Sequence, residues 1–158
     1  MKMDILQKYN QTNLFGKYLD LKLDIVKPGD ITYKVKVQKQ HLATVKSAHG
    51  GFLSAIFDQI VGTAALSKAM ADLKLVATVE FKINFLKPSF INDELTGRGL
   101  VIKHGKRLYT VRGDIYNQDK DLIATGIATL NAYPYEKITN LFFISCIFPT
   151  FNFSNQKK

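Results

Sequence analysis

Residues 47–67 open on the glycine pair Gly50-Gly51 and then stay apolar on almost every side of an expected helix of about five turns. A helix that is hydrophobic all round has to be buried inside something. The apolar run is shorter than the roughly 18 unbroken apolar residues that a membrane span needs. We therefore expect the rest of the chain and a partner chain to cover this helix.

Asp58 stands in the middle of the expected helix, and no Lys, Arg or His lies within four residues of it on either side. A lone carboxylate on a buried helix costs free energy unless it is paired or used. The structural alternative is a carboxylate neutralised by a cation from elsewhere in the fold. The buried position favours a catalytic role for Asp58.

The composition limits the class of protein and its partners. A chain of 158 residues with one cysteine, Cys146, predicts one domain without an intrachain disulfide, which fits the cytoplasm. The net charge of +9 favours an anionic partner, and the lysines are spread along the chain rather than clustered. This spread fits the phosphates of a small molecule, and it equally fits solvated strand faces. We expect no nucleic-acid partner and no membrane span.

Alternating apolar and polar residues predict six strands, two before the central helix and four after it. A short amphipathic helix is expected over residues 3–15, and the central helix should end near residue 72. The predicted strands cover residues 19–25, 33–37, 79–85, 95–102, 108–116 and 122–133. The economical packing is an antiparallel sheet wrapped around one helix, which is the α+β hotdog fold. Gly97 and Gly99 predict a bulge or a close backbone approach.

The domain is expected to span residues 1–137. Residues 138–158 are then an apolar extension whose role the sequence does not indicate, and five of the 11 phenylalanines lie between Phe142 and Phe153.

The motif His49-Gly50-Gly51, followed by Asp58 nine positions after the histidine, resembles the signature of the PaaI-type acyl-CoA thioesterases of the hotdog superfamily. Residues 78–88 resemble the strand that follows the helix in that family, and residues 126–130 resemble its closing strand. The resemblance covers residues 14–135. It implies a dimer or tetramer that hydrolyses the thioester of an acyl-CoA or aryl-CoA without a cofactor.

The resemblance also implies roles for individual residues. The Gly50 amide would polarise the thioester carbonyl, Asp58 would act as nucleophile or general base, and the Thr78 hydroxyl would assist water, with His49 beside the site. Many members carry Asn six residues before the histidine, where this chain has Ala43. That departure favours the alternative function, a non-catalytic module that binds or senses acyl-CoA.

The chemistry of the residues supports the same roles. The first turn of a helix leaves backbone N–H groups unsatisfied and carries a partial positive charge, so the Gly50 amide suits an oxyanion donor. Gly50 and Asp58 are eight residues apart, about 12 Å along one helix, and cannot both reach one carbonyl. If both act on one thioester, they come from different chains across a two-fold axis. Gly62 lies on the helix stripe of Asp58 and would let a neighbouring element approach.

Several of these residues also have structural explanations. Gly50 and Gly51 could simply make a tight loop-to-helix turn, although we expect Gly51 to contact substrate too. His49 could be an exposed residue before the helix. Thr78 falls, in strict alternation, on the polar face of its strand with Glu80, so a place in the site requires a bulge or a strand end.

Basic residues offer a site for the phosphates of CoA. Lys103, Lys106 and Arg107 form the densest basic cluster, at an expected hairpin tip, and Arg98 is a further candidate. The alternative is a solvated hairpin tip. His41 and His104 have no carboxylate or cysteine at metal-ligand spacing, so we expect no metal.

Overall fold

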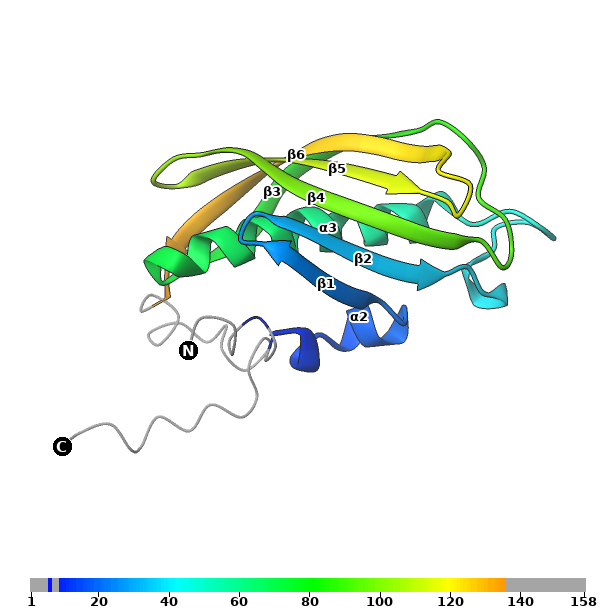
Figure 1. The fold of residues 1–158 in the computed structure, drawn as a ribbon, viewed down its shortest axis with the longest axis horizontal. Coiled ribbons are helices and arrows are strands. Elements are labelled where there is room, and N and C mark those ends of the chain that lie inside the picture. The colour runs from blue at the N-terminus through cyan, green and yellow to red at the C-terminus, as the bar shows by residue number, and fades with distance from the viewer. Residues whose placement is uncertain (1–5, 7–8, 136–158) are drawn as a thin grey trace.

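The computed structural model describes residue 6 and residues 9–135, which form one curved sheet with a long helix on its concave side (Figure 1). The helices are α2 (Leu14–Tyr18) and α3 (Gly50–Ala69), with the short 3-10 helices η1 (Lys39–His41) and η2 (Met70–Asp72). The strands are β1 (Lys22–Lys27), β2 (Asp30–Lys36), β3 (Lys74–Phe85), β4 (Glu94–His104), β5 (Leu108–Tyr116) and β6 (Leu122–Pro134).

The six strands follow the order β1-β2-β4-β5-β6-β3, and every neighbouring pair is antiparallel. Because α3 connects β2 to β3, the chain leaves one part of the sheet and returns at its far edge. This arrangement confirms the predicted α+β hotdog fold. Within the described residues, no helix combines the length and the hydrophobicity that crossing a membrane would require.

Glycines on the inner face of the sheet let α3 pack close to it. A Cβ atom on Gly99 would overlap the carbonyl oxygen of Ile60, and one on Gly97 would lie 3.0 Å from the Ile60 side chain. Gly113 and Gly126, on β5 and β6, make room in the same way for the ring of Phe57. The close backbone approach predicted for β4 is therefore confirmed. Ile60 and Phe57 are fully buried as a result.

The first predicted helix and strand need correction at their boundaries. Residues 9–12 are helical, but the predicted helix is interrupted at Asn13, whose Oδ1 accepts a hydrogen bond from the Gly16 amide at 2.9 Å and caps a second helix, α2, that ends at Tyr18. Leu19 then ends that helix, and Asp20 has a φ of 53°, so the strand begins at Lys22 and not at residue 19. The predicted extension over residues 138–158 lies outside the described residues.

Strand β3 forms one free edge of the sheet. The predicted alternation holds from Phe81 to Phe85, which pair in register with the buried Ala128 and Ala124, whereas Val79, predicted on the same face, is 62% exposed because it lies at a bulge. However, Phe81 is 38% exposed and Phe85 50% exposed, because no further strand covers this edge among the described residues. An uncovered strand of 12 residues is the kind of edge that pairs with another chain.

Candidate active site

Asp58 of α3 and Thr78 of β3 are in direct contact. The Thr78 Oγ1 donates a hydrogen bond to Asp58 Oδ1 at 2.8 Å. A bulge makes this possible, because Thr78 pairs with Leu130 while Glu80 pairs with Thr129, which leaves Val79 as the extra residue. Thr78 therefore shares the helix side of the sheet with Leu130. The bulge that the sequence required of Thr78 is present.

The Asp58 carboxylate lines a cavity of about 110 Å³. Apolar groups form much of the wall, from Gly62 and Leu66 on α3 to Val76 and Leu130 on the sheet. Asp58 is half-buried, and within the described part of the chain no cation lies at salt-bridge distance from it. A carboxylate that accepts a hydrogen bond from a hydroxyl and lines a cavity can act on a reactive group placed there.

The start of α3 offers a backbone donor that no other described residue engages. His49 caps the helix, and its Nδ1 accepts a hydrogen bond from the Gly51 amide at 2.8 Å. That bond already uses the N–H of Gly51, which was expected to contact substrate. In contrast, the Gly50 N–H has no hydrogen-bond partner among residues 6 and 9–135. Gly50 opens onto a separate recess of about 410 Å³, beside Phe85 and Ser89.

Gly50 and Asp58 thus lie on different openings of one protomer. The Gly50 recess extends over residues 85–89, after β3, whereas the Asp58 cavity lies farther along α3. This separation agrees with the distance of about 12 Å expected along the helix.

Two polar residues of the Asp58 cavity were not predicted, Tyr9 and Gln59. The Gln59 Oε1 accepts a hydrogen bond from the Asn13 Nδ2 at 2.6 Å. Burial, together with the negative charge of Asp58, raises the pKa of Tyr9, so its hydroxyl keeps its proton. The sequence places Tyr9 on an apolar helix face but contains no local signal that this face covers Asp58.

Arg98 lies in an ion pair rather than beside Asp58. Its Nε and Nη2 donate to the two carboxylate oxygens of Asp30, at 2.9 and 2.8 Å, across strands β4 and β2. The guanidinium lowers the pKa of the buried Asp30 carboxylate. Two of the donors that a phosphate would need are therefore already engaged, which gives Arg98 a structural role.

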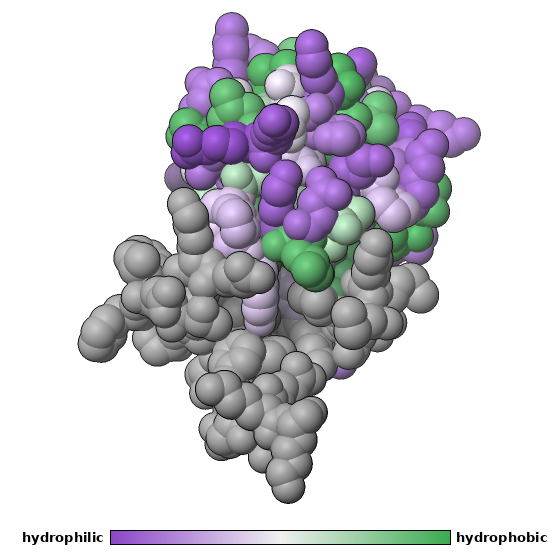
Figure 2. All heavy atoms as spheres, turned by 90° about the vertical axis from the view of Figure 1, so that its left-hand side faces the viewer, coloured by the Kyte–Doolittle hydropathy of each residue, from purple (hydrophilic) through white to green (hydrophobic). Residues whose placement is uncertain are grey.

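Lys103, Lys106 and Arg107 lie at the β4–β5 hairpin, as predicted. The Lys106 carbonyl accepts a hydrogen bond from Lys74 Nζ at 3.0 Å, so the hairpin lies beside the start of β3, four residues before Thr78. The described residues at this end of the molecule are mostly hydrophilic (Figure 2). The three basic side chains are exposed and do not reach the Asp58 cavity.

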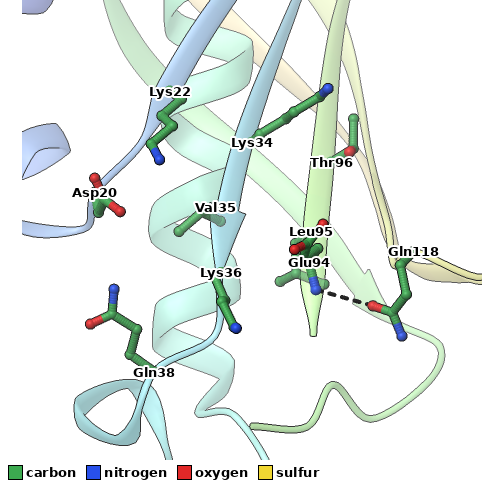
Figure 3. Close-up of a pocket in the computed structure, with 10 residues that line it drawn as sticks. All are labelled: Asp20, Lys22, Lys34, Val35, Lys36, Gln38, Glu94, Leu95, Thr96 and Gln118. Carbon is green, nitrogen blue, oxygen red and sulfur yellow. Dashed lines mark hydrogen bonds between the residues drawn. The ribbon is translucent and has the colours of Figure 1, made fainter. Parts of the chain in front are cut away.

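A wider cleft of about 560 Å³ lies elsewhere, over β1, β2 and β4 (Figure 3). Lys22, Lys34 and Lys36 line it, and Gln118 closes one side by accepting a hydrogen bond from the Glu94 amide at 3.0 Å. It shares no lining residue with the Asp58 cavity. Among the residues that line this cleft, no carboxylate forms a hydrogen bond with a hydroxyl or a histidine. The candidate catalytic pair of Asp58 and Thr78 lies in the smaller cavity.

The histidines do not assemble a metal site in the part of the chain that the structure describes, where no three potential ligands gather. The His41 ring stacks on Phe52 with centroids 3.9 Å apart, and its Nδ1 accepts from the Gln38 amide. His104 stacks on Tyr109 at the hairpin.

Comparison with known proteins agrees with this fold. Residues 46–124 match the model of the Thioesterase superfamily. The human acyl-coenzyme A thioesterase 13 is 26% identical over 100 residues, which are 63% of this chain and 70% of that protein. The Escherichia coli PaaI protein of phenylacetic acid degradation superposes with a TM-score of 0.78 at 22% identity, over 84% of this chain and 93% of PaaI.

A hypothetical thioesterase from Streptococcus pneumoniae, solved with coenzyme A, superposes with a TM-score of 0.72 at 22% identity, over 82% of this chain and 97% of that one. The six-stranded antiparallel sheet around one long helix defines a hotdog protein. The match to the family model is more specific than the fold: the chain belongs to the Thioesterase superfamily. The prediction that it is a thioesterase is confirmed.

Proposed function

We propose that this protein cleaves the thioester of an acyl-CoA or aryl-CoA to the free acid and CoA. The observation that carries the proposal is the hydrogen bond between Thr78 and Asp58, two residues that line one cavity. The coenzyme A in the streptococcal relative and the acyl-coenzyme A named for the human one support this class of substrate.

In the proposed reaction the Gly50 N–H stabilises the negative charge that develops on the thioester oxygen. Asp58 acts as general base on water or as the nucleophile, and Thr78 holds its Oδ1 and orients the water. With Asp58 as general base, the water oxygen adds to the carbonyl carbon, Asp58 takes the proton of that water, the carbon–sulfur bond breaks, and the proton passes to the CoA thiolate. With Asp58 as nucleophile, its carboxylate oxygen adds instead, the CoA thiolate leaves and takes a proton from solvent, and water then hydrolyses the mixed anhydride to the free acid and the Asp58 carboxylate. His49 supports the donor by fixing the first turn of α3.

The two halves of this site come from two copies of the chain. Gly50 and Asp58 open onto different recesses of one protomer, so one protomer alone does not place both on one carbonyl. The free edge of β3, with Val79 62% exposed and Phe81 38% exposed beside Thr78, supports pairing with a second copy there. A dimer, alone or within a tetramer, then contains two equivalent sites.

Lys103, Lys106 and Arg107 are proposed to approach the CoA phosphates from the hairpin beside β3. Their exposure equally suits a solvated tip. Arg98 contributes through its ion pair with Asp30 instead.

The alternative is a module that binds acyl-CoA without turning it over, and Ala43 favours it. Ala43 lies in the exposed loop before α3, where its amide bonds the Ser47 carbonyl at 2.9 Å, and its methyl group offers no hydrogen bond to a thioester. A hydrolase would then depend on Gly50 and Asp58 without an asparagine.

A thiol-release assay over a panel of acyl- and aryl-CoA thioesters separates the two functions. We expect wild type to release CoA from at least one class, and Asp58→Asn to lose at least about a hundredfold in kcat. Tight binding of the whole panel by wild type without thiol release would support the binding module instead.

A further inference from the structure

Gly62 has no structural explanation within the described part of the chain. It lies inside α3, where glycine is less favourable than alanine. Its φ is not positive, so its backbone conformation suits other residues too. Apart from the adjacent residues and the backbone of its own helix, no described atom lies within 4 Å of a Cβ placed on Gly62, whereas a Cβ on Gly99 would overlap the Ile60 carbonyl. The missing side chain therefore leaves open space rather than room for a neighbouring element of the described chain.

The open space lies between the polar and the apolar residues of the Asp58 cavity. At one end the Asp58 carboxylate accepts the hydrogen bond from Thr78. At the other end Leu66 packs in one apolar cluster with Val76. Gly62 stands four residues after Asp58 and four before Leu66, and residues four apart share one face of a helix. All five residues line the cavity, so the space at Gly62 connects the carboxylate to the apolar end.

This space suits the acyl group of a thioester better than its CoA part. None of the described residues that line the cavity carries a positive charge, and the Asp58 carboxylate repels phosphates. Leu66, Val76 and Leu130 instead favour the burial of hydrocarbon. The cavity of about 110 Å³ is also far smaller than the roughly 300–1,000 Å³ of pockets that hold drug-sized ligands, so it is too small for CoA.

We propose that Gly62 is a specificity-determining residue, which leaves open the space that the acyl group of the substrate occupies beside Asp58. This inference rests on the proposed function, the cleavage of a CoA thioester at Asp58. The acyl chain extends from the carbonyl carbon along α3, past Gly62 toward Leu66. The sulfur and CoA lie on the other side of the carbonyl, toward the Gly50 recess of the second protomer. Because the cavity is small, the preferred acyl group is short.

The test measures kcat/KM of Gly62→Ala on straight-chain substrates from acetyl-CoA to dodecanoyl-CoA. The added methyl group takes part of the acyl space and meets no described side chain within 4 Å, so the fold should be retained. The value for acetyl-CoA should stay within about twofold of wild type. The value for the longest chain that wild type hydrolyses should fall about tenfold or more, because that chain needs the space that the methyl group fills.

The matched control is Ala55→Ser, which also adds one heavy atom at a half-buried position of α3. Ala55 lines neither the Asp58 cavity nor the Gly50 recess, so this variant should keep the wild-type kcat/KM for every chain length. Thermal unfolding and analytical ultracentrifugation of both variants show whether the fold and the dimer are retained.

Titration with S-alkyl-CoA thioethers repeats the comparison without turnover, because these analogues have no carbonyl to attack. Gly62→Ala should bind S-hexyl-CoA about tenfold more weakly than wild type and S-methyl-CoA equally well. An equal loss for all chain lengths, no loss for any, the same chain-length dependence in Ala55→Ser, or a monomeric Gly62→Ala would overturn the proposal. If Asp58→Asn keeps full activity, the proposed function fails, and this outcome is distinguishable because the thioether titration does not depend on catalysis.

Discussion

At the scale of single residues, we attribute the role of Gly50, the first residue of α3, to its backbone N–H rather than to its lack of a side chain. The Gly50 N–H has no partner within the described part of the chain. The preceding residue, His49, has φ −73° and ψ 137°, the extended conformation that proline requires of its predecessor. Proline is also well tolerated at the first position of a helix. The donor can therefore be removed with little cost to the fold.

We predict that Gly50→Pro lowers kcat by about a hundredfold or more, because it removes one oxyanion donor. Gly50→Ala is the control, since it keeps the N–H and its Cβ would meet Phe85 at an ordinary 3.5 Å. Steady-state kinetics of the two variants on one CoA thioester is the measurement. Similar losses in both variants would show that space, and not the amide, matters at Gly50.

Thr78 is predicted to act through its hydroxyl. Thr78→Val keeps the shape of the side chain and removes the hydrogen bond to Asp58, so kcat should fall about tenfold while the unfolding temperature stays near that of wild type. The control is Thr129→Val, which removes a similar bond, to Glu80 at 3.1 Å, away from the site. A wild-type kcat for Thr78→Val would exclude the proposed role.

At the scale of elements, the sequence predicted the sheet and its central helix well. The alternation within a strand and the apolar residues of the helix each show, from that element alone, which of its faces are buried. A place for Thr78 in the site required a bulge, but the sequence does not show where the bulge lies. Its position depends on the register of β3 with β6. The boundary at Lys22 was missed, because Leu19 continues the alternation although it ends a helix. Tyr9 was missed because Asp58, whose cavity it lines, is 49 positions away in the sequence.

The pairing of β2 with β4 includes the ion pair of Asp30 and Arg98, and we predict that its role is stability. Arg98→Met should lower the free energy of unfolding by about 2 kcal/mol, less than for a fully buried pair because the guanidinium is half-exposed. The kcat and KM of the folded enzyme should not change. A raised KM for the CoA thioester at unchanged stability would instead place Arg98 in substrate binding.

The same pair makes stability depend on pH in a defined direction. Because Arg98 lowers the pKa of Asp30, the ion pair stabilises the folded protein in full above the ordinary aspartate pKa of about 3.9. It is lost as the pH falls through the lower pKa of the folded protein. Denaturant unfolding of wild type and Arg98→Met at a series of acidic pH values should show the two stabilities converging in that range.

At the scale of the whole molecule, the two edges of the sheet are not equivalent. Val79 on β3 and Val26 on β1 are both 62% exposed, yet only Val79 lies beside Thr78. If the β3 edge pairs with a second copy, a lysine there places two like charges at the two-fold axis. Val79→Lys should therefore give a folded monomer without activity, whereas Val26→Lys should stay dimeric and active. Analytical ultracentrifugation and the thiol-release assay measure both effects.

The central claim is that Gly50 of one protomer and Asp58 of its partner act on the same thioester, and mixing two inactive variants tests it most directly. Co-expressed Gly50→Pro and Asp58→Asn chains form hybrid dimers in which one site has both wild-type residues. We predict that purified hybrids recover about half of the wild-type kcat, because one of two sites is intact. Hybrids as inactive as their parents would contradict the shared site.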